Sequence, residues 1–222
     1  MRALCLHSFR TNGAIMQMQM SLAEQAFPGV EFDFMDGIHV CRDEDVDGAL
    51  KAYFPRDKFG SYREWWNART VDGVTVYERF DDVVEAVRKR LGEKDYDGVV
   101  GFSQGGSVAA AVLGTAPPTV KWAWLQSCFL PRHDGFRFSK KGSVENVLVT
   151  THEDDPIVKK AWTEHLARTI EGSTFVVAPG KAHKLVSLKD KEAAHVHQIQ
   201  NFFSSLSIAT NTHESSSQQK VV

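Results

Sequence analysis

The chain has 222 residues, of which 42% are hydrophobic and 24% charged, and its formal net charge is −2 at pH 7. A chain of this length can bury one sizeable core, so a single α/β domain is the simplest architecture. The small net charge gives no electrostatic basis for binding nucleic acid or an anionic membrane. The three cysteines form no C-x-x-C pair, which argues against a disulfide framework and a zinc site.

The first apolar stretch, residues 1–7, is too short for a signal peptide, and no later run approaches the length of a membrane span. We therefore expect a cytoplasmic protein without a membrane span. Residues 1–206 are expected to form one domain, with an irregular, cap-like insertion at 37–76. The segment 207–222 is rich in Ser, Thr, Asn and Gln without apolar periodicity, which predicts a disordered tail. The sequence does not indicate an oligomeric state.

Strand-like and helix-like patterns alternate along the chain. Short apolar or alternating runs predict strands at 3–7, 30–34, 97–100, 122–126, 147–151 and 174–178. Apolar residues at three- and four-residue steps, or apolar runs after glycine, predict helices at 14–27, 77–91, 105–113, 158–170 and 192–206. This order predicts a doubly wound, mostly parallel sheet whose ligands bind beyond the carboxyl ends of the strands.

The segment Gly101-Phe102-Ser103-Gln104-Gly105 reads G-x-S-x-G between a predicted strand and a predicted helix. This is the context of a nucleophile elbow, in which a serine on a strained turn raises its oxygen above the edge of the sheet. The first turn of the following helix offers unpaired N–H groups and a positive dipole end. A purely structural turn is the alternative, and the context favours Ser103 as a nucleophile.

A serine nucleophile needs a base, and in the α/β-hydrolase chain order the acid follows the serine and the histidine comes last. His183 lies in a loop after the last predicted strand, where that base belongs. His165, His195 and His197 fall within helix patterns. We therefore predict that His183 is the base, with a surface-loop histidine as the alternative.

The acid that orients the base should follow the predicted strand at 147–151. Three acidic residues stand there, Glu153, Asp154 and Asp155. Asp155 precedes Pro156, which favours an extended or turn conformation at Asp155. We prefer Asp155 as the acid, with Asp154 as the alternative. The remaining acidic residues of the three would then form a charge cluster at a helix N-terminus.

The oxyanion hole needs two N–H donors, which we expect from the backbone of Gln104 and of Phe9, in the loop 7–13 after the first strand. His7 is expected to order that loop. The insertion is rich in aromatic residues, including Trp65 and Trp66. These two either seal the sheet or bind substrate as the wall of an acyl pocket, and the second hypothesis predicts a preference for medium or longer acyl chains.

Residues 43–48 match the first half of an EF-hand calcium loop, D-x-D-x-D-G. Position twelve of that loop is Phe54, where a bidentate glutamate is required. We therefore expect no calcium site, and the reaction outlined by the other motifs needs no metal or cofactor.

Three features together resemble one known family: L-H-S-F-R-T-N-G at 6–13, the Trp65-Trp66 pair, and G-V-V-G-F-S-Q-G at 98–105. They are similar to the fungal- and plant-type serine hydrolases related to the human ovarian-cancer-associated serine hydrolase, and the likeness runs through most of the chain. The resemblance implies an α/β-hydrolase fold, esterase or thioesterase activity, and a triad that maps onto Ser103, Asp155 and His183. Ser8 departs from the family, which usually has glycine after the opening histidine. The glycine-rich approach to the last histidine is here Gly-Lys-Ala.

These features predict a serine hydrolase that transfers an acyl group from a small-molecule ester to water. One alternative is a thioesterase that releases acyl chains from coenzyme A or a carrier protein. Another, from a different class, is a non-catalytic ligand-binding relative of the fold.

Overall fold

The computed structural model describes residues 1–132 and 144–218. In this part of the chain six parallel strands form one sheet, in the order β10-β9-β8-β7-β1-β2. The strands are β1 (Arg2–Leu6), β2 (Glu31–Met35), β7 (Gly98–Phe102), β8 (Trp122–Gln126), β9 (Asn146–His152) and β10 (Thr174–Ala178). The predicted parallel α/β sheet is confirmed, and all its strands end at the same edge.

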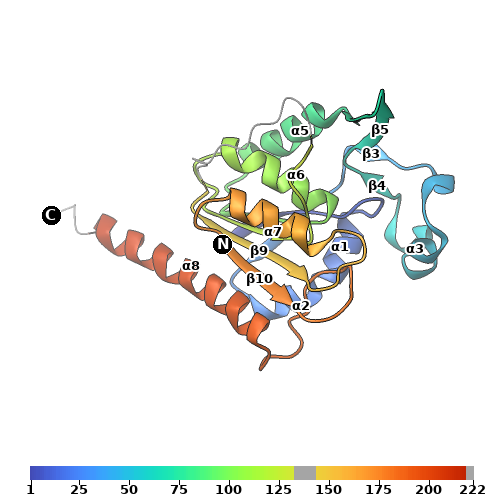
Figure 1. Ribbon diagram of the computed structural model, residues 1–222. Coiled ribbons are helices and arrows are strands. Elements are labelled where there is room, and N and C mark those ends of the chain that lie inside the picture. The colour runs from blue at the N-terminus through green and yellow to red at the C-terminus, as the bar shows by residue number, and fades with distance from the viewer. Residues whose placement is uncertain (133–143, 219–222) are drawn as a thin grey trace.

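Helices cover both faces of this sheet (Figure 1). One face carries α1 (Gly13–Gln19), α2 (Ser21–Ala26) and α8 (Ala194–Gln218), and the other carries α5 (Phe80–Glu93), α6 (Gln104–Val112) and α7 (Lys160–Thr169). A short 3-10 helix, η2 (Leu113–Thr115), follows α6. Because both faces are covered, successive strand residues enter two different apolar cores: Leu4 packs on one side of β1 and Cys5 on the other.

The helix expected at 14–27 is interrupted at Met20, which ends α1 and begins α2. Asn12 fixes the start of α1, since its side chain accepts a hydrogen bond from the N–H of Ile15 at 2.9 Å. The tail expected to be disordered from residue 207 is instead helical as far as Gln218, because α8 continues through it. Extending a helix that already exists costs less than starting one, and this segment contains no proline or glycine.

The insertion expected to be irregular folds into short regular elements between β2 and α5. It contains two small antiparallel sheets, β3 with β4 and β5 with β6. In chain order its elements are β3 (His39–Val40), η1 (Asp43–Asp45), α3 (Gly48–Tyr53), α4 (Arg56–Phe59), β4 (Arg63–Glu64), β5 (Asn67–Val71) and β6 (Val74–Glu78). Tyr77, which we expected at the start of a helix, therefore lies in β6.

Among residues 1–132 and 144–218, no helix combines the length and the apolar character that crossing a membrane requires.

Candidate active site

Ser103 lies between β7 and α6, where the chain turns sharply. Its backbone has φ 53° and ψ −117°, a strained conformation for a residue with a side chain. The flanking glycines permit this turn. A Cβ on Gly101 would lie 2.5 Å from the oxygen of Gly105, and a Cβ on Gly105 would lie 2.2 Å from the oxygen of Leu6. The G-x-S-x-G spacing is therefore a packing requirement of the turn at the carboxyl edge of the sheet.

His183 connects the serine to a carboxylate. Its Nε2 lies 3.0 Å from Ser103 Oγ, and its Nδ1 lies 2.8 Å from Asp155 Oδ2 and 3.0 Å from Asp155 Oδ1. An ionised carboxylate only accepts hydrogen bonds, so in the neutral ring Nδ1 carries the proton and Nε2 accepts from the serine hydroxyl. His183 reaches this position from the loop after β10, and its ring packs on Phe102 with centroids 5.0 Å apart.

Asp155 is held toward the histidine by the chain that follows it. Its side chain is buried, and its Oδ1 accepts hydrogen bonds from the N–H groups of Ile157 and Val158, both at 2.9 Å. Asp154, the alternative acid, is exposed to solvent. The geometry thus favours Asp155 as the partner of His183.

The loop between β1 and α1 borders the nucleophile. The N–H of Gly105 donates to the oxygen of His7 at 3.1 Å, which holds this loop against the start of α6. Gln104 is the first residue of α6, where N–H groups have no partner inside the helix. Within the described part of the chain, the N–H of Phe9 donates to no other group. The oxyanion role of these two amides stays a prediction.

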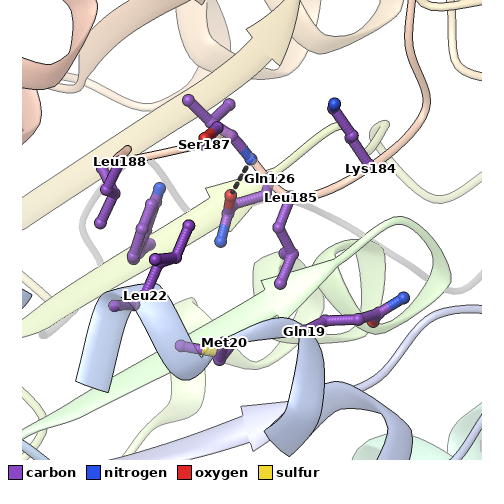
Figure 2. Close-up of a pocket in the computed structure, with 11 residues that line it drawn as sticks. Gln19, Met20, Leu22, Gln126, Lys184, Leu185, Ser187 and Leu188 are labelled. Carbon is purple, nitrogen blue, oxygen red and sulfur yellow. Dashed lines mark hydrogen bonds between the residues drawn. The ribbon is translucent and has the colours of Figure 1, made fainter. Parts of the chain in front are cut away.

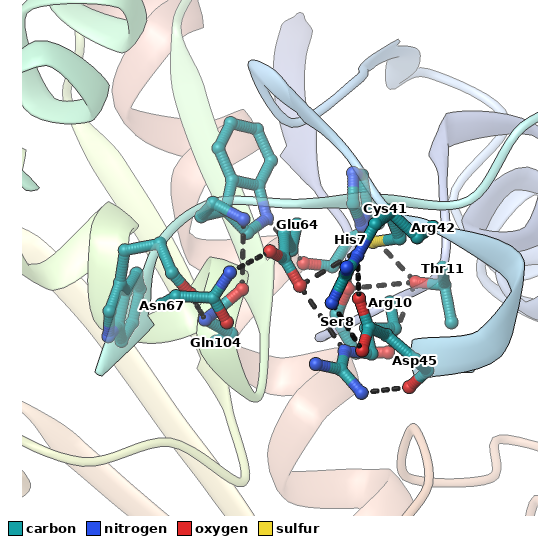
Figure 3. A network of polar contacts seen from close by, with 12 residues as sticks. His7, Ser8, Arg10, Thr11, Cys41, Arg42, Asp45, Glu64, Asn67 and Gln104 are labelled. Carbon is teal, nitrogen blue, oxygen red and sulfur yellow. Dashed lines mark hydrogen bonds and ion pairs between the residues drawn. The ribbon is translucent and has the colours of Figure 1, made fainter. Parts of the chain in front are cut away.

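His7 is completely buried at the base of this loop, within a network of polar contacts (Figure 3). Its Nε2 accepts a hydrogen bond from the N–H of Gly37 at 2.8 Å, and its Nδ1 lies 2.7 Å from the oxygen of Ser8. An amide N–H only donates and a carbonyl only accepts, so the ring is neutral with its proton on Nδ1. Burial lowers the pKa of His7 to about 4. His7 therefore orders the loop that carries Phe9.

Gln104 has a second set of contacts, through its side chain, that the sequence did not reveal. Its Oε1 accepts a hydrogen bond from the N–H of Trp65 at 2.9 Å, and its Nε2 donates to the oxygen of Trp66 at 2.7 Å (Figure 3). Trp65 Nε1 in turn donates to the oxygen of His7 at 2.8 Å. The one available signal was a large amide side chain at the start of a helix made otherwise of small and apolar residues. This clamp ties the insertion to the residue after the nucleophile.

Glu64 adds a buried charge to the same junction. Its Oε2 lies 3.3 Å from Arg10 Nε, and its Oε1 accepts a hydrogen bond from the side chain of Asn67. Arg10 also donates to the oxygen of Asp45. The loop after β1 is thus fixed to the insertion by charge-assisted hydrogen bonds as well as by packing.

Trp65 and Trp66 are both buried, with exposed fractions of 0% and 4%. Trp66 packs against Tyr77 and Phe80, with ring centroids 5.2 Å and 5.1 Å apart. Of the two hypotheses for these tryptophans, their burial favours the one in which they seal the core, rather than the one in which they bind substrate.

Aspartates of the calcium-like motif at 43–48 form ion pairs with arginines. Arg56 lies 2.9 Å from Asp43, and Arg42 lies 2.8 Å from Asp45. Over the described ranges, with 133–143 and 219–222 left out, no group of three or more His, Cys, Asp or Glu side chains is arranged to hold a metal ion.

A parallel sheet covered on both faces, with its serine turn at the carboxyl edge, defines the α/β-hydrolase fold. Solved structures agree: Zea mays acyl-protein thioesterase 2 matches with a TM-score of 0.62 and 14% identity, over 92% of each chain. A Bacillus cereus carboxylesterase matches with a TM-score of 0.60 and 18% identity, over 91% of this chain and 87% of that one. At these identities the likeness concerns the fold.

The family follows from the sequence itself. The family model described as serine hydrolase (FSH1) matches residues 1–193, and the chain belongs to this family. An esterase of Caenorhabditis elegans, C25G4.2, is 28% identical over 212 residues, which cover 86% of this chain and 90% of that protein. The chain is thus an enzyme of the serine hydrolase class, and the family resemblance read from the three motifs is confirmed.

Proposed function

We propose that this enzyme hydrolyses carboxylic esters of medium or longer acyl chains through a covalent acyl-enzyme on Ser103. The observation that carries the proposal is the unbroken line of hydrogen bonds from Asp155 through His183 to Ser103. Such a line gives a serine the base that it needs and holds that base in the right tautomer.

In the first half-reaction Ser103 Oγ attacks the ester carbonyl carbon while His183 Nε2 takes the hydroxyl proton. The carbonyl oxygen becomes negatively charged and is stabilised by the N–H groups of Phe9 and Gln104. The bond to the alcohol oxygen then breaks, and His183 returns its proton to that oxygen. Asp155 stabilises the imidazolium between these two transfers.

In the second half-reaction a water molecule attacks the acyl carbon and gives a proton to His183. Collapse of this second intermediate breaks the bond to Ser103 Oγ, which recovers the proton, and the free acid leaves. The same two steps apply to a thioester, with a thiol as the leaving group.

An apolar cavity of about 270 Å³ supports the preference for longer acyl chains. It is lined in part by Phe129, Leu130 and Trp162, and Trp162 is 45% exposed. Phe129, which lines it, contacts the helix that follows the nucleophile. The N–H of Ser107 donates to the oxygen of Ser103 at 3.0 Å, and Ser107 Oγ accepts from the N–H of Phe129 at 3.2 Å. We therefore assign the acyl-binding role to this cavity in place of Trp65 and Trp66.

Labelling with a fluorophosphonate probe tests the nucleophile directly. We expect one covalent adduct on Ser103 and none on the variant Ser103→Ala. Turnover should then be measured on p-nitrophenyl esters and acyl-thioesters of two to twelve carbons. Faster turnover of thioesters than of matching esters would move the assignment to a thioesterase, and an unlabelled, inactive protein would identify a non-catalytic relative.

A further inference from the structure

A second cavity, of about 250 Å³, borders the segment that follows His183 (Figure 2). Its wall is formed by residues 184–188, by the junction of α1 and α2, and by two side chains of β8, Trp124 and Gln126. Most of this wall is apolar, including Met20, Leu22 and Leu185. This cavity lies on the face of the sheet that carries α1 and α2. The cavity proposed for the acyl chain, which Phe129 and Trp162 line, lies on the side of α7.

Gln126 is the polar group whose orientation defines this cavity. Only 1% of it is exposed, and its Oε1 accepts a hydrogen bond from the N–H of Val186 at 3.2 Å. Because a backbone N–H only donates, this bond fixes which end of the amide is the oxygen. The nitrogen must then point the other way, and Figure 2 shows it directed into the space beside Leu22 and Leu185.

The amide nitrogen of Gln126 has no hydrogen-bond partner within the described part of the chain. Within the same described residues, Gln19 Oε1 in this wall also has no partner, whereas two other polar groups are engaged. Trp124 Nε1 donates to Thr150 Oγ1 at 3.1 Å, and Ser187 Oγ accepts from the N–H of Lys189 at 3.3 Å. A buried donor without a partner is rare in folded proteins, and an apolar cavity with a few polar groups is the usual form of a small-molecule site.

We propose that this cavity binds a small uncharged molecule with an apolar body and one hydrogen-bond acceptor, such as a carbonyl oxygen, that accepts from Gln126 Nε2. The volume of about 250 Å³ suits roughly eight non-hydrogen atoms, taking the ~30 Å³ that a water molecule occupies in the liquid for each. A charged ligand is disfavoured, because an ion would lose its hydration against apolar walls. The site is separate from the one at Ser103 and does not depend on the proposed reaction.

Binding would also tighten the segment next to His183. Gln126 holds Val186 through its oxygen and would hold the ligand through its nitrogen, so the two hydrogen bonds share one amide. A bound ligand fixes that amide and packs against Leu185 and Leu188. Amide hydrogen exchange at Val186 should therefore slow when the ligand binds.

Acetophenone and ethylbenzene provide a matched pair of probes, since they have nearly the same shape and only acetophenone has an acceptor. In ¹⁵N-edited NMR spectra, acetophenone should shift the side-chain amide signals of Gln126 and slow exchange at Val186. Acetophenone should bind about three- to tenfold more tightly than ethylbenzene, the contribution of one hydrogen bond. Equal affinities, or unshifted Gln126 signals, would overturn the proposal.

Three variants and one labelled protein complete the test. Gln126→Met should remove the preference for acetophenone, while Gln17→Met, at an exposed position on α1, should keep it. Leu22→Trp should fill the cavity from α2 and abolish binding of both probes. Protein labelled at Ser103 by a fluorophosphonate should bind acetophenone as before. Loss of binding on labelling would place the ligand at Ser103 and refute a separate site.

Discussion

Two histidines, His7 and His183, lie in loops at the same edge of the sheet, and their surroundings give them opposite properties. Both ring nitrogens of His7 contact backbone groups, and the ring is fully buried. His183 instead faces a carboxylate with Nδ1 and a serine hydroxyl with Nε2, and its side chain is 17% exposed. Burial favours the neutral form of His7, while His183 lies between a carboxylate and a hydroxyl.

The comparison shows that the partners of a histidine decide its role more than its place in the fold does. A ring held by a backbone N–H on one side and a carbonyl on the other has no nitrogen left to exchange a proton with substrate. A ring between a carboxylate and a hydroxyl can take a proton and give it back. Each of the following experiments should separate these two environments, or show that they are less distinct than we infer.

The largest effect should come from the group that His183 contacts through Nε2. Ser103→Ala should lower turnover by about 10⁴- to 10⁶-fold, as removal of a triad nucleophile does. The fold should be retained, because alanine only removes the hydroxyl, as circular dichroism can check. Turnover within tenfold of the parent enzyme would show that His183 acts on another nucleophile.

The second-largest effect should come from Asp155, the carboxylate that His183 contacts through Nδ1. Asp155→Asn presents an amide to Nδ1, which favours the wrong tautomer, and should lower kcat by up to roughly 10⁴-fold. Asp154→Asn is the matched control at the exposed neighbour and should stay close to the parent. Steady-state kinetics on a p-nitrophenyl ester decides between them, and the opposite ranking would identify Asp154 as the acid.

The third effect concerns stability and comes from the protonation of His7. Its pKa is about 4 in the folded protein, below the value near 6.5 of an unfolded chain, so between these values the unfolded state binds more protons. Stability should therefore be fully present above about pH 6.5 and fall toward pH 4, by at most about 3 kcal/mol from this residue.

Urea unfolding of the parent and of His7→Gln at several pH values would measure this contribution. The variant should lose much of the slope between pH 4 and 6.5, while His197→Gln, at an exposed position on α8, should keep it. Equal slopes in all three proteins would mean that folding does not lower the pKa of His7.

The smallest effect concerns substrate selection at the cavity lined by Trp162. Trp162→Ala should reduce the preference for an octanoyl over an acetyl ester by about tenfold, because each buried methylene contributes about 0.8 kcal/mol. Trp66→Phe should leave the chain-length profile unchanged, since Trp66 packs within the core. The reverse pattern in kcat/KM would restore Trp66 to the wall of the acyl pocket.

Much of the fold could be predicted because its signals are local. Buried strands are short apolar runs, and the predicted strands at 122–126 and 174–178 coincide with β8 and β10. Gly101 and Gly105 indicate the turn at Ser103, since only a residue without a side chain fits at these two positions. The chain order of serine, acid and histidine then pointed to Asp155 and His183.

Other features could not be predicted because they depend on contacts between distant residues. The break at Met20 is hidden by an apolar pattern that continues across it, as Met16, Met20 and Ala23 all enter the same core. The contacts of the Gln104 side chain require the insertion to dock. The sequence alone does not show whether an aromatic residue packs in a core or contacts a substrate. For this reason two hypotheses stayed open for Trp65 and Trp66.

The clamp on Gln104 has a consequence for how the enzyme becomes active after synthesis. Its bond to Trp65 joins residues 39 positions apart, and the bond between Ser103 and His183 joins residues 80 positions apart. Contacts between such distant segments form late, because closing long loops costs entropy before any contact compensates for it. Helices, and strands that are close in the chain such as β8 and β9, can therefore form while the nucleophile still lacks both its base and its ordered neighbour. On refolding, circular dichroism should recover first and ester turnover afterwards, so that a newly made chain acquires its shape before it acquires its reactivity.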